Sequence, residues 1–301
     1  MRIEQPDSGG PRRPSGPRDP GDAWVVADSG ERYWGRFGAA GLLAHDPARG
    51  VLLQHRVSWS HFGGTWGIPG GARHEGESAT DAAMRESLEE AGVPGDALAP
   101  LLTSVLDLGV WSYTTLVAHV TRPFEPVIAD PESYALRWVP VGELDSLPLH
   151  PGFASSWPAL RALLNERPTI LVDAANVVGS VPDGWWRDRA DAAERLLTDL
   201  EAVARAGFDA RSLGLPGAVW FPHVVAVLEG DARDARAVGP TVELIRAAGS
   251  GEETLVAEAA ARIARGERVT LVTSDRGLAE RATAAGASVR PVSWLRDAFR
   301  P

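Results

Sequence analysis

Residues 71–93 read GARHEGESATDAAMRESLEEAGV, and this stretch decides how the first half of the chain folds. Ser78 and Asp81 have the spacing of a capping box, and Gly92 provides a stop, so a helix is predicted over residues 78–91. On a wheel of about 100° per residue, an apolar stripe lies opposite an arc of three carboxylates. The stripe is Met84, Leu88 and Ala91, and the carboxylates are Glu86, Glu89 and Glu90.

The three glutamates leave two interpretations open. Like charges three or four residues apart destabilise a helix by about 0.2–0.5 kcal/mol per pair, and a divalent cation would offset this repulsion. A glycine turn that contains Gly70 and Gly71 precedes the helix and can bring backbone carbonyls close, while Glu77 enters at the helix N-terminus. The segment is therefore either a solvated acidic face or a cation site.

Composition narrows the function classes. The chain has 301 residues, no cysteine and a formal net charge of −10, and all 30 of its basic residues are arginine. Without thiolates a metal must bind oxygen or imidazole, which favours Mg²⁺ or Mn²⁺. The acidic balance argues against duplex nucleic acid as a partner. The absence of a long apolar run or a signal-like N-terminus predicts a cytoplasmic protein with no membrane partner.

The length suggests two domains. Residues 1–22 are rich in Pro, Gly and Arg and are expected to form a disordered tail. Residues 23–166 contain short apolar runs at 38–44, 50–56, 112–120 and 136–141 that predict strands of a mixed sheet, with a second helix over 156–165. Residues 167–301 alternate predicted strands and helices, so a second α/β domain with a parallel sheet is expected there.

The glutamate-rich segment resembles the signature of the Nudix hydrolases. The matching positions are Gly71, Glu77, Arg85, Glu86, Glu89, Glu90, Gly92 and Val93, and Ser87 departs from the pattern because an apolar residue is usual there. The resemblance implies an α/β/α sandwich that hydrolyses a nucleoside diphosphate linked to another group, with Mg²⁺ or Mn²⁺ as cofactor. An NTP or dNTP such as 8-oxo-dGTP, or an ADP-ribose-like nucleotide, would be the substrate.

The resemblance also implies roles for single residues. Glu89 and Glu90 would be metal ligands, Glu86 a ligand or the general base, and the carbonyl of Gly70 a further ligand. Arg85 would orient the glutamates, although an ordinary ion pair with Glu89 is compatible with the same position. Gly71 and Glu77 would support the site.

Other residues near this segment have two interpretations each. Glu132 is the candidate for an additional catalytic carboxylate, or it is a solvated loop acid. Trp66 lies in a context similar to that of enzymes that remove 8-oxo-dGTP, and it is predicted either to stack on a base or to be buried in the sheet. The histidines of this region are proton carriers or structural residues, and they are His55, His61 and His74.

Acidic residues follow the predicted strands of the second half. Because ligands bind beyond the carboxyl ends of parallel strands, these acids predict a second metal site, or they simply cap the following helices. They are Asp173, Glu229, Glu253 and Asp275, with Glu252 beside Glu253. This half resembles PIN-like and NYN nucleases. Single-stranded RNA would be contacted by two tryptophans and two arginines, or these residues form a tryptophan core with surface arginines; they are Trp185, Trp186, Arg187 and Arg189.

The sequence thus favours a metal-dependent nucleotide hydrolase. The alternatives are a metal-dependent RNase through the second domain, and a regulator that binds nucleotide or RNA without turnover.

Overall fold

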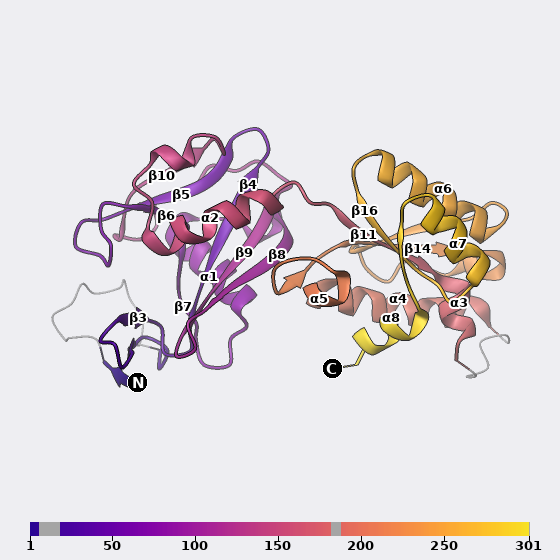
Figure 1. The fold of residues 1–301 in the computed structure, drawn as a ribbon, viewed down its shortest axis with the longest axis horizontal. Helices are drawn as coiled ribbons and strands as arrows, with labels where there is room; N and C mark the ends of the chain where they lie inside the picture. The colour runs from indigo at the N-terminus through magenta and orange to yellow at the C-terminus, as the bar shows by residue number, and fades with distance from the viewer. Residues whose placement is uncertain (6–18, 182–187, 301) are drawn as a thin grey trace. The chain divides into compact units, whose positions relative to one another are not determined.

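The structure is a computed structural model that describes residues 1–5, 19–181 and 188–300. The chain divides into two compact units, Met1–Leu164 and Asn165–Pro301, and each is described by itself below (Figure 1). Within the described ranges no helix has the length and apolar character needed to cross a bilayer.

Unit 1 is built on a mixed sheet with the strand order β10-β5-β4-β9-β8. Strands β4 and β9 run parallel, whereas β4–β5, β5–β10 and β8–β9 are antiparallel, which confirms the predicted mixed sheet. Two short strands extend it, because β6 pairs with β5 and β7 pairs with β4. The bounds are β4 (Ala39–Asp46), β5 (Gly50–Arg56), β6 (Trp66–Gly67), β7 (Gly70–Ala72), β8 (Leu98–Asp107), β9 (Ser112–Val120) and β10 (Ser133–Val139).

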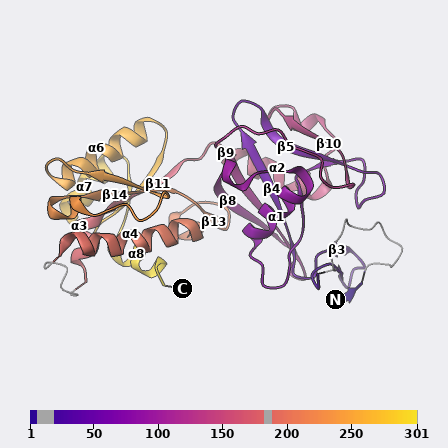
Figure 2. The ribbon, with the colours of Figure 1, turned by 180° about the vertical axis from the view of Figure 1, so that it is seen from behind.

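Two helices cover opposite faces of this sheet (Figures 1 and 2). Helix α1 (Ala79–Ala91) starts at Ser78, whose side chain accepts a hydrogen bond from the Asp81 amide, and it ends at Gly92 with φ 62°. Helix α2 (Pro151–Leu163) begins five residues before the predicted start, because His150 caps it and Pro151 suits its first turn. Short 3-10 turns lie at η1 (Gly95–Ala97) and η2 (Leu144–Ser146).

The buried face of α1 differs from the predicted one. Leu88 is 56% exposed, whereas Glu86 is 1% and Glu90 5% exposed. The small residues Ala82, Ala83 and Ala91 let α1 approach β4, β7 and β9. Of the predicted apolar stripe only Ala91 is fully buried, and the two glutamates take the buried positions instead of Leu88. Ser87, the departure from the family pattern, is also buried, and its hydroxyl donates to the Met84 carbonyl.

The N-terminal residues contribute a small antiparallel sheet, β1-β2-β3. Its strands are β1 (Arg2–Glu4), β2 (Trp24–Val26) and β3 (Arg32–Trp34). Ile3 pairs with Val25, and the rings of Trp24 and Trp34 lie 5.1 Å apart. The structure therefore has a strand at residues 2–4, inside the segment expected to be disordered, while residues 6–18 lie outside the described part of the chain.

Unit 2 contains a five-stranded parallel sheet with the order β15-β14-β11-β16-β17, which confirms the predicted parallel α/β arrangement. Helices α3, α4 and α8 pack on one face, and α6 and α7 on the other. The chain order changes direction between β11 and β16, and ligands bind at such a point in open α/β sheets. The strands and helices are β11 (Pro168–Asp173), α3 (Ala174–Gly179), α4 (Arg189–Ala206), β12 (Phe208–Asp209), α5 (Ala210–Leu213), β13 (Val219–Trp220), β14 (His223–Leu228), η4 (Gly230–Asp234), β15 (Val242–Arg246), α6 (Gly251–Ala264), β16 (Arg268–Val272), α7 (Arg276–Ala284), β17 (Ser288–Arg290) and α8 (Val292–Ala298).

Candidate functional site

Two glutamates of α1 lie against the glycine strand β7. A side chain at Gly71 would place its Cβ 2.5 Å from the carboxyl carbon of Glu86, so that carboxylate occupies the space left by the missing side chain. The Gly70 amide donates to Glu90 Oε2 over 2.9 Å. A Cβ at Gly70 would in turn lie 2.5 Å from the Ala40 carbonyl oxygen. Gly71 is therefore required by the close contact of α1 with β7, and Gly70 by the close contact of β7 with β4.

Arg85 holds several groups of the site in one place. Its Nε and Nη2 donate to the two oxygens of Glu77 over 2.8 and 2.9 Å, a bidentate pair. Its Nη1 donates to Glu86 Oε1 over 2.9 Å and to Glu89 Oε2 over 3.4 Å. Nη2 also donates to the Ala72 carbonyl. The hydrogen bonds from Arg85 lower the pKa of Glu77, so this pair is charged throughout the physiological range.

Burial raises the pKa of Glu90 to about 8, and the charge of Glu86 adds to the rise. Glu132 raises the pKa of Glu90 further, whereas the Gly70 amide and the charge of Arg56 lower it. The structure thus brings Glu132 within electrostatic reach of Glu90, although the two are far apart in sequence. Glu132 is held there because its carbonyl accepts the Val57 amide over 3.0 Å.

Two further residues of this site have no sequence signal. The charge of Arg56, at the end of β5, reaches Glu90, and its Nε donates to the His61 carbonyl. The Tyr113 hydroxyl lies where a side chain at Gly41 or Gly70 would be, and burial together with Glu90 raises its pKa. Both residues come from strands, and only the pairing of β4 with β7 and β9 places Tyr113 near Gly70.

The donor set fits a hard divalent cation in part. Glu86 and Glu90 are buried carboxylates that repel one another, and a cation between them would remove this repulsion. Glu89 is different, because its side chain is 55% exposed. In residues 1–5, 19–181 and 188–300, no three acidic or histidine side chains converge closely enough to hold a metal ion by themselves. A cation here would need backbone, water or phosphate oxygens as well.

The aromatic and histidine candidates lie around the end of β5. Trp66 stacks on His55 with centroids 4.7 Å apart, so one face of its ring is covered. Side chains alternate along β5, which places His55 and Arg56 on opposite faces. Trp66 therefore shares a face with His55 and not with Arg56. The His74 amide donates to Glu77 Oε2, and burial lowers the pKa of His61.

In unit 2, Asp173 lies at the carboxyl end of β11. Its Oδ1 accepts the Asn176 amide and caps α3, and its Oδ2 accepts the Thr273 hydroxyl over 2.8 Å. Burial raises the pKa of Asp173, and the charges of Glu229 and Glu252 raise it further. Glu229 and Glu252 thus lie in electrostatic reach of Asp173 at this end of the sheet.

The other predicted acids of unit 2 act mainly as helix caps. Asp275 Oδ1 accepts the Leu278 amide over 2.7 Å at the start of α7. Glu229 Oε2 accepts the Gly251 amide over 2.8 Å at the start of α6. Glu253 is exposed, and it is its neighbour Glu252 whose charge reaches Asp173. Arg189 opens α4, while the other expected RNA contacts, Trp185, Trp186 and Arg187, lie outside the described residues.

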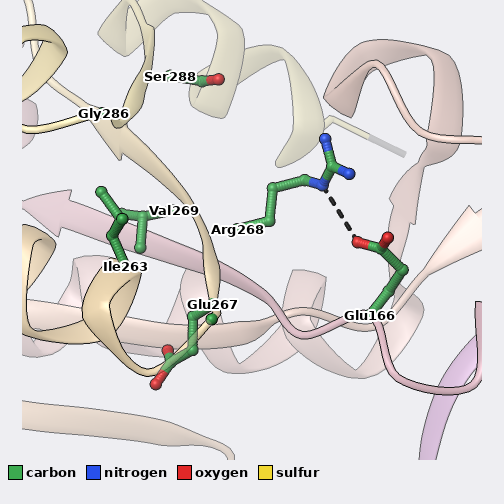
Figure 3. A pocket seen from close by; sticks show the side chains of 8 residues that line it. Glu166, Ile263, Glu267, Arg268, Val269, Gly286 and Ser288 are labelled. Carbon is green, nitrogen blue, oxygen red and sulfur yellow. Dashed lines mark hydrogen bonds and ion pairs between the residues drawn. The ribbon is translucent and has the colours of Figure 1, made fainter.

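A pocket of about 390 Å³ lies at the opposite edge of the parallel sheet (Figure 3). Arg268 and Ser288, the first residues of β16 and β17, line it, and Arg268 Nε pairs with Glu166 over 3.2 Å. Because ligands of parallel α/β sheets bind at the carboxyl ends of strands, this pocket is at the wrong edge to include the acids.

Comparison with known proteins identifies unit 1. The model of the NUDIX domain matches residues 35–163. The chain belongs to the Nudix family, and it is a hydrolase that acts on phosphoric anhydride bonds. Nudix enzymes generally use divalent metals such as Mg²⁺ or Mn²⁺.

Several relatives match this part of the chain. "Putative 8-oxo-dGTP diphosphatase 3" of Mycobacterium tuberculosis is 51% identical in an alignment of 154 positions that covers 48% of this chain and 70% of the relative. A "Nucleoside triphosphate pyrophosphatase/Nudix hydrolase fusion protein" of Bifidobacterium longum is 40% identical in an alignment of 158 positions that covers 50% of this chain and 33% of the relative. The crystal structure of a Nudix hydrolase from M. smegmatis, RenU, has 47% sequence identity and a TM-score of 0.43, covering 47% of this chain and 94% of that one.

Proposed function

We propose that unit 1 hydrolyses a nucleoside triphosphate of the 8-oxo-dGTP kind to a mononucleotide and pyrophosphate with the help of Mg²⁺ or Mn²⁺. The observation that carries the proposal is the pair of buried, mutually repelling carboxylates, Glu86 and Glu90, held against Gly70 and Gly71. A like-charge pair in this position is unfavourable for folding alone. The identity of 51% to the mycobacterial relative supports the choice of substrate.

The residues of α1 and β7 would hold the cation and keep its ligands in position. Glu86, Glu89, Glu90 and the Gly70 carbonyl would hold the cation, with Glu89 turning inward about its side-chain torsions. When bound, the cation would neutralise phosphate charge and lower the pKa of the attacking water. Arg85 would keep Glu86 and Glu89 in place through the ion pairs it makes with them. Glu77 would fix the Arg85 guanidinium.

Proton transfer and substrate binding would use the surrounding residues. Glu86 or Glu132 would accept the proton of the attacking water, because a general base must be within reach of the reacting oxygen and both carboxylates lie near Glu90. Arg56 would bind a phosphate, since its positive charge reaches Glu90. Trp66, which stacks on His55 on the face opposite Arg56, is not given a part in substrate binding.

The test is product release from a panel of nucleotides with Mg²⁺ and with Mn²⁺. The panel includes 8-oxo-dGTP, the four dNTPs, ADP-ribose and NADH, and it compares wild type with Glu90→Gln and Asp173→Asn. We expect 8-oxo-dGTP to be the best substrate and turnover to be lost in Glu90→Gln alone. Preference for ADP-ribose or NADH would reject the substrate class. Binding of a nucleotide without release of any product would reject catalysis and favour the regulator.

A second function is proposed for unit 2, as a metal-dependent nuclease of the PIN-like or NYN kind. The observation that favours it is the placement of Asp173, Glu229 and Glu252 near the point where the strand order reverses. Asn176 links the two strand ends there, because its Oδ1 accepts the Ser274 amide over 2.8 Å. Single-stranded RNA is the proposed substrate.

Cleavage of a labelled single-stranded RNA in the presence of Mn²⁺ tests this second function. Asp173→Asn keeps the capping oxygen of the side chain and removes the charge, so it should abolish cleavage while unit 2 stays folded. Glu253→Gln is the matched control and should cleave normally, because Glu253 is exposed. Cleavage that survives in Asp173→Asn would reject the proposed site.

A further inference from the structure

Phe62 has an unusual backbone for an exposed aromatic residue. In the described ranges it is the one residue other than glycine with a positive φ, at 56°. A side chain with a Cβ is strained in this conformation, whereas glycine is not. The residue is nevertheless 44% exposed, so burial is not what holds it in this conformation. Strain of this kind is concentrated at ligand sites.

The loop that carries Phe62, residues 57–65, is tightly fixed. The Gly63 amide donates to the Ser60 carbonyl, and the Thr65 hydroxyl donates to the Phe62 carbonyl over 2.6 Å. A Cβ at Gly63 would lie 2.4 Å from the Val57 carbonyl oxygen, so the turn folds directly back on the end of β5. The loop therefore presents the ring from a rigid base.

The Phe62 ring lies between two histidines, and Arg56 is a neighbour of both. The ring contacts His61 with centroids 4.2 Å apart and His150 with centroids 4.8 Å apart. Arg56, at the end of β5, donates from Nε to the His61 carbonyl over 3.2 Å. The charge of Arg56 reaches His61, His150 and Glu90, so one guanidinium connects the surroundings of Phe62 with the carboxylates.

We propose that Phe62 is the residue on which the base of the substrate nucleotide stacks, and that it determines the preference for nucleotides over other diphosphates. The inference rests on the proposed nucleotide hydrolysis by unit 1. A base stacked on the exposed part of this ring would leave its phosphates near Arg56 and Glu90. Both histidines beside the ring are kept neutral, because burial and Arg56 lower their pKa, and a neutral aromatic surface suits an uncharged base.

The experiment compares binding of a nucleotide and of a ligand without a base. Calorimetry in the presence of Mg²⁺ gives the Kd of the α,β-methylene analogue of dGTP and the Kd of inorganic tripolyphosphate for each variant. Phe62→Gly removes the ring and relieves the backbone, so it should fold with an unchanged or higher Tm. We expect its Kd for the analogue to rise about tenfold or more, which is the usual contribution of one stacked base. Its Kd for tripolyphosphate should not change.

Two further variants sharpen the comparison. Phe62→Tyr keeps the ring and should bind the analogue like wild type. Tyr134→Leu is the matched control, because Tyr134 is 59% exposed in the same unit but lies beside His55, on the face opposite Arg56, and its binding should be normal. An unchanged Kd in Phe62→Gly, an equal loss for both ligands, or a base-dependent loss in Tyr134→Leu would each overturn the assignment.

The two proposals can fail separately. Wild type that binds the analogue through Phe62 but hydrolyses no nucleotide would reject the proposed hydrolysis and leave the stacking residue in place. Wild type that hydrolyses nucleotides with no dependence on Phe62 would reject only the stacking residue. No binding of the analogue by wild type would reject the assignment of Phe62.

Discussion

The acids of the two units are used in different ways. In unit 2, Asp173, Asp275 and Glu229 each accept a backbone amide at the start of a helix, so the fold itself accounts for them. In unit 1, Glu86 and Glu90 are buried one helical turn apart; Glu86 pairs with Arg85 and Glu90 accepts the Gly70 amide, yet the charge of Glu86 still raises the pKa of Glu90. Two acidic side chains that are buried together, one raising the pKa of the other, are the better indication of a catalytic site.

The largest expected effect is on turnover in Glu90→Gln. The glutamine side chain keeps an oxygen for the Gly70 amide but lacks the charge that would hold the cation, so we expect a rate lower by about 100- to 1000-fold. Thermal unfolding should be nearly unchanged, since the carboxyl is already costly to ionise in its buried position. Asp173→Asn should leave nucleotide turnover as in wild type, and a common loss in both variants would remove the distinction between the units.

Arg85→Gln should have the next largest effect, this time on stability. It leaves Glu77 and Glu86 without their cation, and their side chains are only 14% and 2% exposed. Removing one partner of such a buried pair costs about 3 kcal/mol in the free energy of unfolding. Arg137→Gln breaks an exposed pair with Glu143 and should cost less than about 0.5 kcal/mol in the same urea titration. Equal losses would show that Arg85 is an ordinary surface ion pair.

Gly71→Ala tests the contact between helix and strand. The new methyl group would lie 2.5 Å from the carboxyl carbon of Glu86, so α1 must shift, at a cost of about 1–3 kcal/mol and with loss of turnover. Gly142→Ala adds the same methyl group where nothing lies within 4 Å, and its unfolding free energy should stay within about 0.5 kcal/mol. A stable and active Gly71→Ala enzyme would contradict the packing of Glu86 on the strand.

The smallest effect concerns pH. Burial lowers the pKa of His150 to about 4, and its Nδ1 caps α2 by accepting the Gly152 amide over 3.2 Å. Because the folded pKa lies below the ordinary value of about 6.5, the stabilisation is complete above that value and is lost as the pH falls toward 4. Asparagine at position 150 can cap the helix but does not titrate. Between about pH 7 and pH 5, the free energy of unfolding of His150→Asn should therefore fall by about 1 kcal/mol less than that of wild type, after allowance for solvent screening.

Urea unfolding at the two pH values measures this difference. A parallel loss in wild type and His150→Asn would show that another group causes the acid sensitivity of the chain. The difference between wild type and His150→Asn reports on unit 1, because the residues of this cap all belong to unit 1.

Much of the fold follows from local sequence. The strands at Gly50–Arg56 and Ser112–Val120 have the bounds that their apolar runs predict, and α1 lies between Ser78 and Gly92, the residues that should cap it. The small sheet that includes residues 2–4 was not predicted, since a three-residue strand next to a polar segment has no pattern of its own. The face of α1 was predicted wrongly, because alanines rather than Leu88 form its contact with the sheet.

The sequence by itself determined the family, the glutamate-rich helix and the parallel sheet of unit 2, because capping residues, glycines and hydrophobic periods act over a few neighbouring positions. Only the tertiary structure decided that Glu86 and Glu90 are buried while Glu89 is exposed, and that Arg56, Tyr113 and Glu132 surround them. These arrangements depend on strand pairing and on the close approach of α1 to β7. Contacts between residues far apart in the chain leave no spacing pattern along it.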